Sequence, residues 1–353
     1  MLLALLWLAA CAPTEPDPAP ADPAQAGPWR AGHRRVDLVR DGRGFAVELW
    51  YPTDAEVAGE PVPDAFLDGE RRETYAGLLA AAPEGCPTTR TEAARDALVA
   101  EGGPWPVVIS SHCFGCTRFS TFTVAERLAT HGFVVAAPDH EGDTLFDTLA
   151  GAPLPLDTTT LALRRADVGD VLDRLLGGAL APDLAVDPAR VGAMGHSFGS
   201  VTTGLLTQED PRVRAAVGLA APMENPLLPG VQMADLTVPL MLLVAREDHS
   251  ISELGNLLIR DNAANAGGPV ALVEVDDAGH WSVSDLCGVD PGFMPGCGAD
   301  TRLDGSTFDY LPAPEGRAIT ATLVTGFLLE TLVDGVDHLG AAGLDGVELS
   351  RIP

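Results

Sequence analysis

Short apolar runs alternate with segments of helical periodicity along most of this chain. The run at 238–244 is almost continuously apolar, which is typical of a strand buried on both faces. Residues 161–176 instead carry apolar side chains near helical spacing. Strands that alternate with helices predict an α/β fold, in which helices cover both faces of a mostly parallel, eight-stranded sheet. The expected strands lie at 36–39, 46–51, 106–111, 133–137, 191–194, 215–219, 239–244 and 270–275.

Composition divides the chain into four segments. Residues 1–11 form an apolar run that is too short to span a bilayer as a helix, and its end, Leu-Ala-Ala-Cys, resembles a bacterial lipobox with Cys11 as the lipidated residue. Residues 12–33 are rich in Pro, Ala and Asp, a composition that cannot build a core and suits a tether. Residues 34–335 carry the α/β pattern, and 336–353 are expected to form a C-terminal tail.

The lipobox-like end predicts an exported bacterial lipoprotein of the cell envelope, in the periplasm or at the outer membrane. Contact with the membrane is then expected through the lipid anchor at Cys11 only. Secretion without an anchor and a cytosolic location are the alternatives, and in the latter Cys11 is a buried residue near a short apolar N-terminus.

The charge of the chain excludes one class of partner. The formal net charge is −28, and all 22 basic residues are arginine. A chain this acidic repels phosphate backbones, so we expect no nucleic acid partner.

The most informative motif is Gly-His-Ser-Phe-Gly at 195–199, which matches the Gly-x-Ser-x-Gly nucleophile elbow. The expected strand at 191–194 precedes it, and a small, apolar, helix-like run follows it. Small residues are needed two positions before and after Ser197 because the strained turn brings backbone segments close together. The sequence therefore predicts that Ser197 is a nucleophile, and a Gly-Ser turn without chemistry is the alternative.

A serine nucleophile needs a base and an orienting acid, and in this arrangement they follow in the order Ser, Asp or Glu, His. His280 follows the expected strand at 270–275 and is the predicted base, ahead of His249 and His338. Asp248 follows the strand before it and is the predicted acid, with its neighbour Glu247 as the competitor.

Acyl transfer also needs two donors for the oxyanion of the tetrahedral intermediate. The backbone N–H of Phe198, directly after the nucleophile, is the first candidate. The second is Phe114, in the loop at 112–118 that follows the strand at 106–111. This chemistry requires no metal and no organic cofactor.

Residues 111–118, Ser-His-Cys-Phe-Gly-Cys-Thr-Arg, resemble the Ser-His-Gly-x-Gly-x-x-Arg loop of platelet-activating-factor acetylhydrolases and their dienelactone-hydrolase-like bacterial relatives. Residues 128–140, 195–199 and 279–285 are similar to the same family. The resemblance implies an α/β-hydrolase fold for the catalytic domain, hydrolysis of a carboxylic ester and an oxyanion donor at Phe114.

Two positions depart from this family pattern. Cys113 stands where family members usually have Gly, and Ala220 stands where the animal acetylhydrolases place their acid. The chain therefore resembles bacterial members and cutinase-like polyester hydrolases more closely, which agrees with Asp248 as the acid.

The expected function is that of a serine ester hydrolase that forms an acyl-enzyme from a small-molecule or lipid ester with a short acyl group. A polyester, lactone or amide hydrolase with the same triad is the alternative within the enzymes. A non-catalytic, hydrolase-like envelope lipoprotein is the alternative outside them.

Five cysteines follow Cys11, and export would permit disulfides. Cys287 and Cys297 bracket a short loop after His280 and are the expected pair, which leaves Cys86 without a partner. Cys113 and Cys116 form either a local bridge or two free thiols. No metal site is expected, because a zinc site would need more converging ligands.

Overall fold

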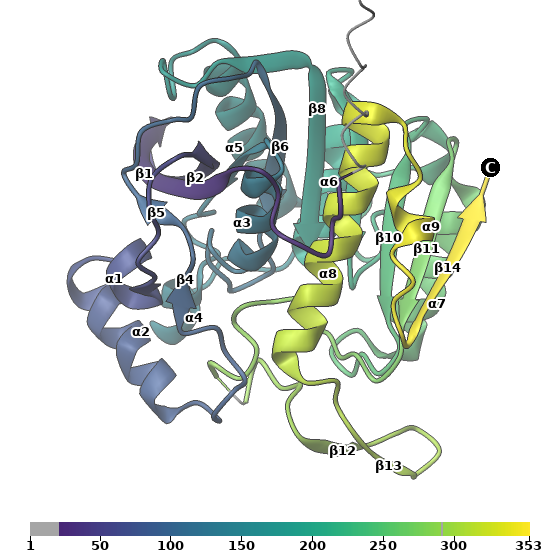
Figure 1. Ribbon diagram of the computed structural model, residues 1–353. Coiled ribbons are helices and arrows are strands. Elements are labelled where there is room, and N and C mark those ends of the chain that lie inside the picture. The colour runs from purple at the N-terminus through teal and green to yellow at the C-terminus, as the bar shows by residue number, and fades with distance from the viewer. Residues whose placement is uncertain (1–20, 291) are drawn as a thin grey trace, which may run out of the picture.

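The computed structural model describes residues 21–290 and 292–353 (Figure 1). Its main sheet has ten strands and not the predicted eight, in the order β14-β11-β10-β9-β8-β6-β7-β2-β1-β5. Six central strands are parallel, and most of their residues are buried, as the apolar runs predict, except for residues 186–190, which are exposed or half-buried. They are β6 (Trp105–Ser111), β7 (Val134–Pro138), β8 (Val186–His196), β9 (Val213–Leu219), β10 (Leu240–Ala245) and β11 (Val270–Val275).

Antiparallel strands flank the parallel ones on both sides. The strands expected at 36–39 and 46–51 are present as an antiparallel hairpin of β1 (Arg30–Arg40) and β2 (Arg43–Thr53), and β2 pairs with β7. The two-residue strand β5 (Ala94–Arg95) lies beyond β1. The prediction of a C-terminal tail at 336–353 is wrong for the last residues of the chain. There β14 (Val347–Ile352) pairs with β11 along its whole length. Its residues are exposed or half-buried at the edge of the sheet, so its sequence lacks the apolar run of a central strand.

Helices cover both faces of the sheet, as expected. Alternate residues of one strand enter different cores, since Val107 and Ile109 contact one helical layer and Val108 contacts the other. One layer contains α3 (Phe122–Thr130) and α8 (Ala313–Leu329), and α8 lies across the front of the sheet in Figure 1. The other contains α5 (Thr158–Leu176), α6 (Phe198–Glu209) and α7 (Ser252–Asn265).

The remaining elements lie outside these layers. Residues 60–103 contain two helices, and residues 285–313 contain a small hairpin that projects beyond the end of α8 (Figure 1). The remaining strands are β3 (Glu60–Pro61), β4 (Arg90–Thr91), β12 (Ala299–Thr301) and β13 (Thr307–Asp309). The remaining helices are α1 (Val62–Phe66), α2 (Gly69–Ala81), α4 (Leu145–Leu149), α9 (His338–Ala341), a 3-10 turn at Met233–Asp235 and a π-helical turn at Glu330–Asp334.

One described segment, Ala313–Asp334, is long and apolar enough to cross a membrane by length and composition. Most of its residues are buried inside the protein, because α8 packs against the sheet and against α3. Burial in the core therefore accounts for its apolar composition.

The segment expected to be a tether is packed against the domain over its described part. The backbone N–H of Trp29 donates to the carbonyl oxygen of Thr130, and the Trp29 ring lies edge-on to Trp105 with 5.0 Å between the ring centres. The strand β1 begins at Arg30, inside the segment 12–33. The predicted signal segment 1–11, with Cys11, lies outside the described residues.

Candidate active site

The turn at Ser197 joins β8 to α6 in an uncommon backbone conformation. Ser197 has a φ of 55° and a ψ of −121°, a region that non-glycine residues rarely adopt. A Cβ atom on Gly195 would lie 2.0 Å from the carbonyl oxygen of Gly199. A Cβ atom on Gly199 would lie 1.9 Å from the carbonyl oxygen of Ser111. The strand, turn and helix expected around Ser197 are all present, and backbone contact excludes a side chain at both glycines.

A chain of two hydrogen bonds joins the three residues predicted to form the triad. The Ser197 hydroxyl lies 2.9 Å from Nε2 of His280, and Nδ1 of His280 lies 2.6 Å from Oδ2 of Asp248. They reach each other because Ser197, Asp248 and His280 all follow parallel strands, and the carboxyl ends of those strands lie at one edge of the sheet.

The second oxygen of Asp248 fixes the orientation of its carboxylate. Oδ1 accepts hydrogen bonds from the backbone N–H groups of Ser250 and Ile251 at 2.9 and 3.0 Å, which leaves Oδ2 for His280. A carboxylate can only accept, so Nδ1 of His280 carries the proton and Nε2 is free to accept from the serine. The competitor Glu247 forms an ion pair with Arg302 and takes no part in this chain.

The other histidines considered from the sequence lie elsewhere. His249 contacts Tyr310 and Asp300, and His338 contacts Asp334. Sequence reasoning missed His196, whose Nε2 lies 2.9 Å from the carbonyl oxygen of His280. The ring of His196 therefore supports the backbone of the predicted base.

The two predicted oxyanion donors are Phe198 and Phe114. Phe198 is the first residue of α6, so its N–H has no acceptor within the helix and lies at the end that favours negative charge. Phe114 lies in the turn after β6. Within residues 21–290 and 292–353, neither N–H donates a hydrogen bond, and the two rings lie 6.5 Å apart. Both groups are free to bind a developing anion.

A second Ser–His–Asp arrangement lies beneath the loop that contains Phe114. The Ser111 hydroxyl lies 3.0 Å from Nε2 of His140, and Nδ1 of His140 lies 3.1 Å from Oδ2 of Asp167. All three side chains are buried, and Oγ of Ser111 also accepts a hydrogen bond from Arg164. A substrate cannot reach this serine, so the arrangement supports the loop.

Arg164 and Asp143 hold the same loop. Arg164 donates to the carbonyl oxygen of His112 and pairs with Asp143, whose other oxygen accepts from the N–H of Gly115 at 3.0 Å. Arg164 lies in the run at 161–176 that the sequence predicts to be helical, but its complete burial follows only from the tertiary packing.

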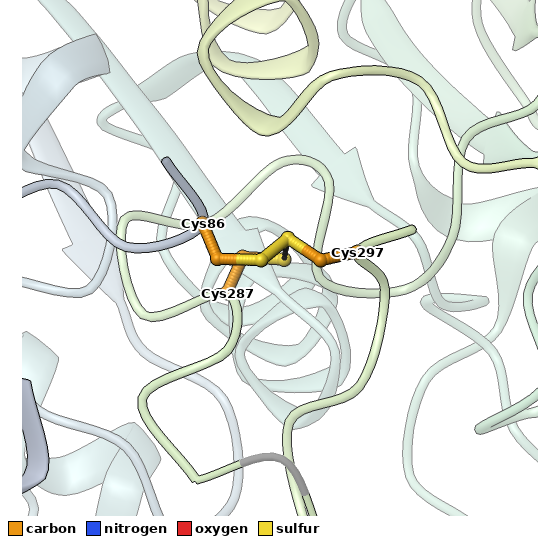
Figure 2. Close-up of side chains that lie close together, drawn as sticks. All are labelled: Cys86, Cys287 and Cys297. Atoms are coloured by element: carbon orange, nitrogen blue, oxygen red, sulfur yellow. Dashed lines mark hydrogen bonds between the residues drawn. A yellow bond between two sulfur atoms is a disulfide. The ribbon is translucent and has the colours of Figure 1, made fainter. Parts of the chain in front are cut away.

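The predicted Cys287–Cys297 pair is wrong. Cys297 is bonded to Cys86, and Cys287 is a buried thiol whose Sγ lies 3.8 Å from Sγ of Cys297 (Figure 2). Cys86 follows α2, and packing brings it to this loop across 211 positions, a separation that spacing in the sequence does not reveal. Cys113 and Cys116 form the local bridge, which encloses Phe114 and Gly115.

The sulfur atoms of Cys86, Cys287 and Cys297 are also the one group of metal-ligating side chains found among the described residues, all within 4.8 Å of one another. Metal ligation requires thiolates, and two of these sulfurs are in a disulfide. The group in this state does not fit a metal ion.

Comparison with known proteins identifies the same class of fold and chemistry. A model of the dienelactone hydrolase family matches residues 95–282, and a model of platelet-activating factor acetylhydrolase, isoform II, matches residues 20–149. Cutinase est2 of Thermobifida alba is 28% identical over 183 residues, which cover 52% of this chain and 55% of the cutinase. A putative carboxymethylenebutenolidase of Methylorubrum extorquens is 28% identical over 219 residues, 59% of this chain and 72% of that protein. The match to the cutinase thus spans little more than half of the cutinase's own length.

Among solved structures, a ferulic acid esterase from Streptomyces cinnamoneus has a TM-score of 0.65 at 24% identity, over 87% of this chain and 91% of that one. This likeness confirms the α/β-hydrolase fold that the sequence predicts.

Proposed function

Because this chain belongs to the dienelactone hydrolase family, we propose that it is a serine hydrolase that cleaves carboxylic esters through an acyl-enzyme on Ser197. The observation that carries the proposal is the hydrogen-bonded chain from Ser197 through His280 to Asp248. A serine hydroxyl is a poor nucleophile alone, and this chain supplies both the base and its orienting acid.

The reaction has two halves that use the same groups. Oγ of Ser197 attacks the ester carbonyl carbon while its proton passes to Nε2 of His280. The C–O bond to the alcohol breaks, and the proton on Nε2 passes to the leaving oxygen. Water then repeats the sequence on the acyl-enzyme, releases the carboxylic acid and restores the serine hydroxyl.

Asp248 and the oxyanion donors act on the charges that form during each half. Asp248 keeps His280 in the required tautomer and stabilises the imidazolium. The N–H groups of Phe198 and Phe114 would stabilise the tetrahedral oxyanion, and loss of one such donor typically costs about 10²- to 10³-fold in kcat.

The relatives support esters as the substrate class, and their own substrates differ. Short-acyl and lipid esters are the substrates we propose, in agreement with the match to platelet-activating factor acetylhydrolase. The match to a cutinase favours a polyester as the second candidate. Turnover of a series of p-nitrophenyl esters from acetyl to palmitoyl, beside release of acids from a polyester film, distinguishes the two.

The test of the proposed mechanism is reaction with a fluorophosphonate, read by intact mass and peptide mapping. We expect one adduct on Ser197 in the wild type and none in Ser197→Ala. Asp248→Asn should lower kcat by about 10⁴-fold, because the histidine tautomer is no longer fixed.

Ser111→Ala is the matched control, since it removes the serine of the second Ser–His–Asp arrangement. This variant should still carry the adduct on Ser197. An adduct on Ser111, or none on folded wild type, would refute the proposed nucleophile.

A further inference from the structure

We infer that His112, which lies outside the triad, is a positioning residue that fixes the Cys113–Phe114 peptide as a donor to the oxyanion. The inference rests on the proposed function, because it assigns a role within the same site. It concerns a side chain that the hydrolytic steps above do not use.

Two hydrogen bonds hold the imidazole of His112, which is buried at the end of β6. Its Nε2 lies 3.0 Å from the backbone nitrogen of His140. Its Nδ1 lies 2.7 Å from the carbonyl oxygen of Cys113. Both ring nitrogens are therefore in use.

These partners permit only one tautomer of the ring. The backbone N–H of His140 can only donate, so Nε2 of His112 must present a lone pair. The carbonyl oxygen of Cys113 can only accept, so the single proton of the neutral ring lies on Nδ1. Burial and the nearby Arg164 hold the pKa of His112 well below its usual range, which keeps the ring neutral near pH 7.

The hydrogen bond from Nδ1 acts on the predicted oxyanion donor through one peptide bond. The carbonyl oxygen of Cys113 and the N–H of Phe114 belong to the same planar unit. A donor held on that oxygen fixes the rotation of the plane, and hence the direction of the N–H. It also polarises the amide and makes the N–H a stronger donor.

The neighbouring groups of the loop are anchored as well. Arg164 holds the carbonyl oxygen of His112, Asp143 holds the N–H of Gly115, and the bridge from Cys113 to Cys116 closes the loop. The N–H of Phe114 lies between these anchors and has no acceptor within the described residues. The hydrogen bonds that surround it leave this one donor available to substrate.

Two variants test the two hydrogen bonds of His112 one at a time, because each variant keeps one bond and loses the other. The amide nitrogen of His112→Asn can occupy the place of Nδ1 and keep the donor to Cys113. The amide of His112→Gln can reach the place of Nε2 and keep the acceptor for His140. If His112 were only structural, the activities of His112→Asn and His112→Gln would not depend on which of the two hydrogen bonds each variant keeps.

We expect His112→Gln to lower kcat on a p-nitrophenyl ester about tenfold or more, and by no more than the roughly 10²- to 10³-fold that complete loss of an oxyanion donor costs, while KM stays within about twofold. His112→Asn should recover most of that kcat. The ratio of wild-type to variant kcat should not change between about pH 6 and about pH 9, because His112 does not titrate there. His131→Gln is the control, since His131 lies before β7, away from the carboxyl ends of the parallel strands, and within the described residues the one hydrogen bond of its ring is to the carbonyl oxygen of Gln25.

The tautomer is measured independently of activity by long-range ¹H–¹⁵N NMR of the imidazoles, with His112→Gln used for assignment. We expect the proton on Nδ1. A proton on Nε2, equal loss of kcat in both variants, or a rise in KM alone would overturn the role of His112 in an enzyme that still labels on Ser197. Absence of labelling and of turnover in the wild type would instead refute the proposed function, and the role of His112 with it.

Discussion

At the scale of single residues, hydrogen-bond partners decide which of two adjacent carboxylates belongs to the site. Asp248 has two backbone donors on one oxygen and His280 on the other, so its position is fixed from both sides. Glu247 is only one residue away but is held by Arg302. The difference comes from the turn after β10, which directs the two side chains to different partners.

Glu126 gives a residue-scale prediction for stability. It lies in α3, where the Thr91 hydroxyl and the N–H of Glu92 donate to its carboxyl group. Burial raises the pKa of Glu126 to about 8, although these donors act in the opposite direction. In the unfolded chain the group should titrate near its ordinary value of about 4.3.

The sign of the pH dependence follows from these two values. A folded pKa above the unfolded one means that the folded state binds the proton more tightly. The contribution of Glu126 is therefore fully present at low pH, and it is lost as pH rises from about 4 to about 8. Glu126→Gln removes this titration, so its free energy of unfolding relative to wild type should increase with pH over that window.

Urea unfolding at about pH 5 and about pH 8.5 measures this difference, in both proteins under the same conditions. Glu92→Gln is the matched control, because Glu92 is exposed next to the same contact. Parallel pH profiles for Glu126→Gln and wild type would show that Glu126 is ionised in the folded protein.

At the scale of elements, central strands were predictable from sequence and edge strands were not. The six parallel strands are largely buried on both faces, so each leaves a mainly apolar run, but residues 186–190 of β8 are polar and partly exposed and leave none. β14 has polar residues at an exposed edge, and β5 is only two residues long, so neither leaves such a run. The helices α1 and α2 lie between short strands in a polar, Pro-rich stretch that gave no strong period.

The candidate site also contains residues that could be predicted from the sequence and residues that could not. Ser197, Asp248 and His280 were predictable because each follows an apolar strand in a fixed chain order. The supports under the oxyanion loop were not, since Asp143 and Arg164 meet only after β7 and α5 pack together. The partner of Cys297 could not be predicted either, because Cys86 comes from a distant part of the chain.

The three cysteines in Figure 2 allow a prediction about how two elements are joined. The Cys86–Cys297 bridge ties the loop after α2 to the segment after β11, and the thiol of Cys287 lies close enough to Cys297 to replace Cys86. In Cys86→Ser, oxidation should therefore join Cys287 to Cys297. The loop after α2 would lose its covalent tie, so limited proteolysis there should be faster than in wild type.

Disulfide mapping of non-reduced peptides tests this exchange, and Cys287→Ser is the control that should keep the Cys86–Cys297 bridge. Burial raises the pKa of Cys287 to about 11, so the alternative bridge should form slowly near neutral pH. If Cys297 remains a free thiol in oxidised Cys86→Ser, Cys287 does not act as its alternative partner.

At the scale of the whole molecule, negative charge strongly exceeds positive charge. Fifty acidic residues face 22 arginines, so many carboxylates have no cation of their own. Most of the arginines form ion pairs on the surface, such as Arg351 with Glu330 and Arg246 with Glu348. Exposed pairs of this kind contribute only about 0–1 kcal/mol each, while the excess negative charge repels itself throughout the folded chain.

Salt should therefore stabilise this protein. Between about 0.01 M and about 0.5 M NaCl the screening length falls well below the size of the domain, so long-range repulsion weakens more than the short contacts within ion pairs. We expect Tm to rise with salt by calorimetry, and to rise equally in KCl, because screening depends on ionic strength and not on which cation is present. A rise in only one salt would indicate a specific cation site. A fall in Tm would mean that salt weakens the stabilising arginine–carboxylate pairs more than it weakens the destabilising repulsion between carboxylates.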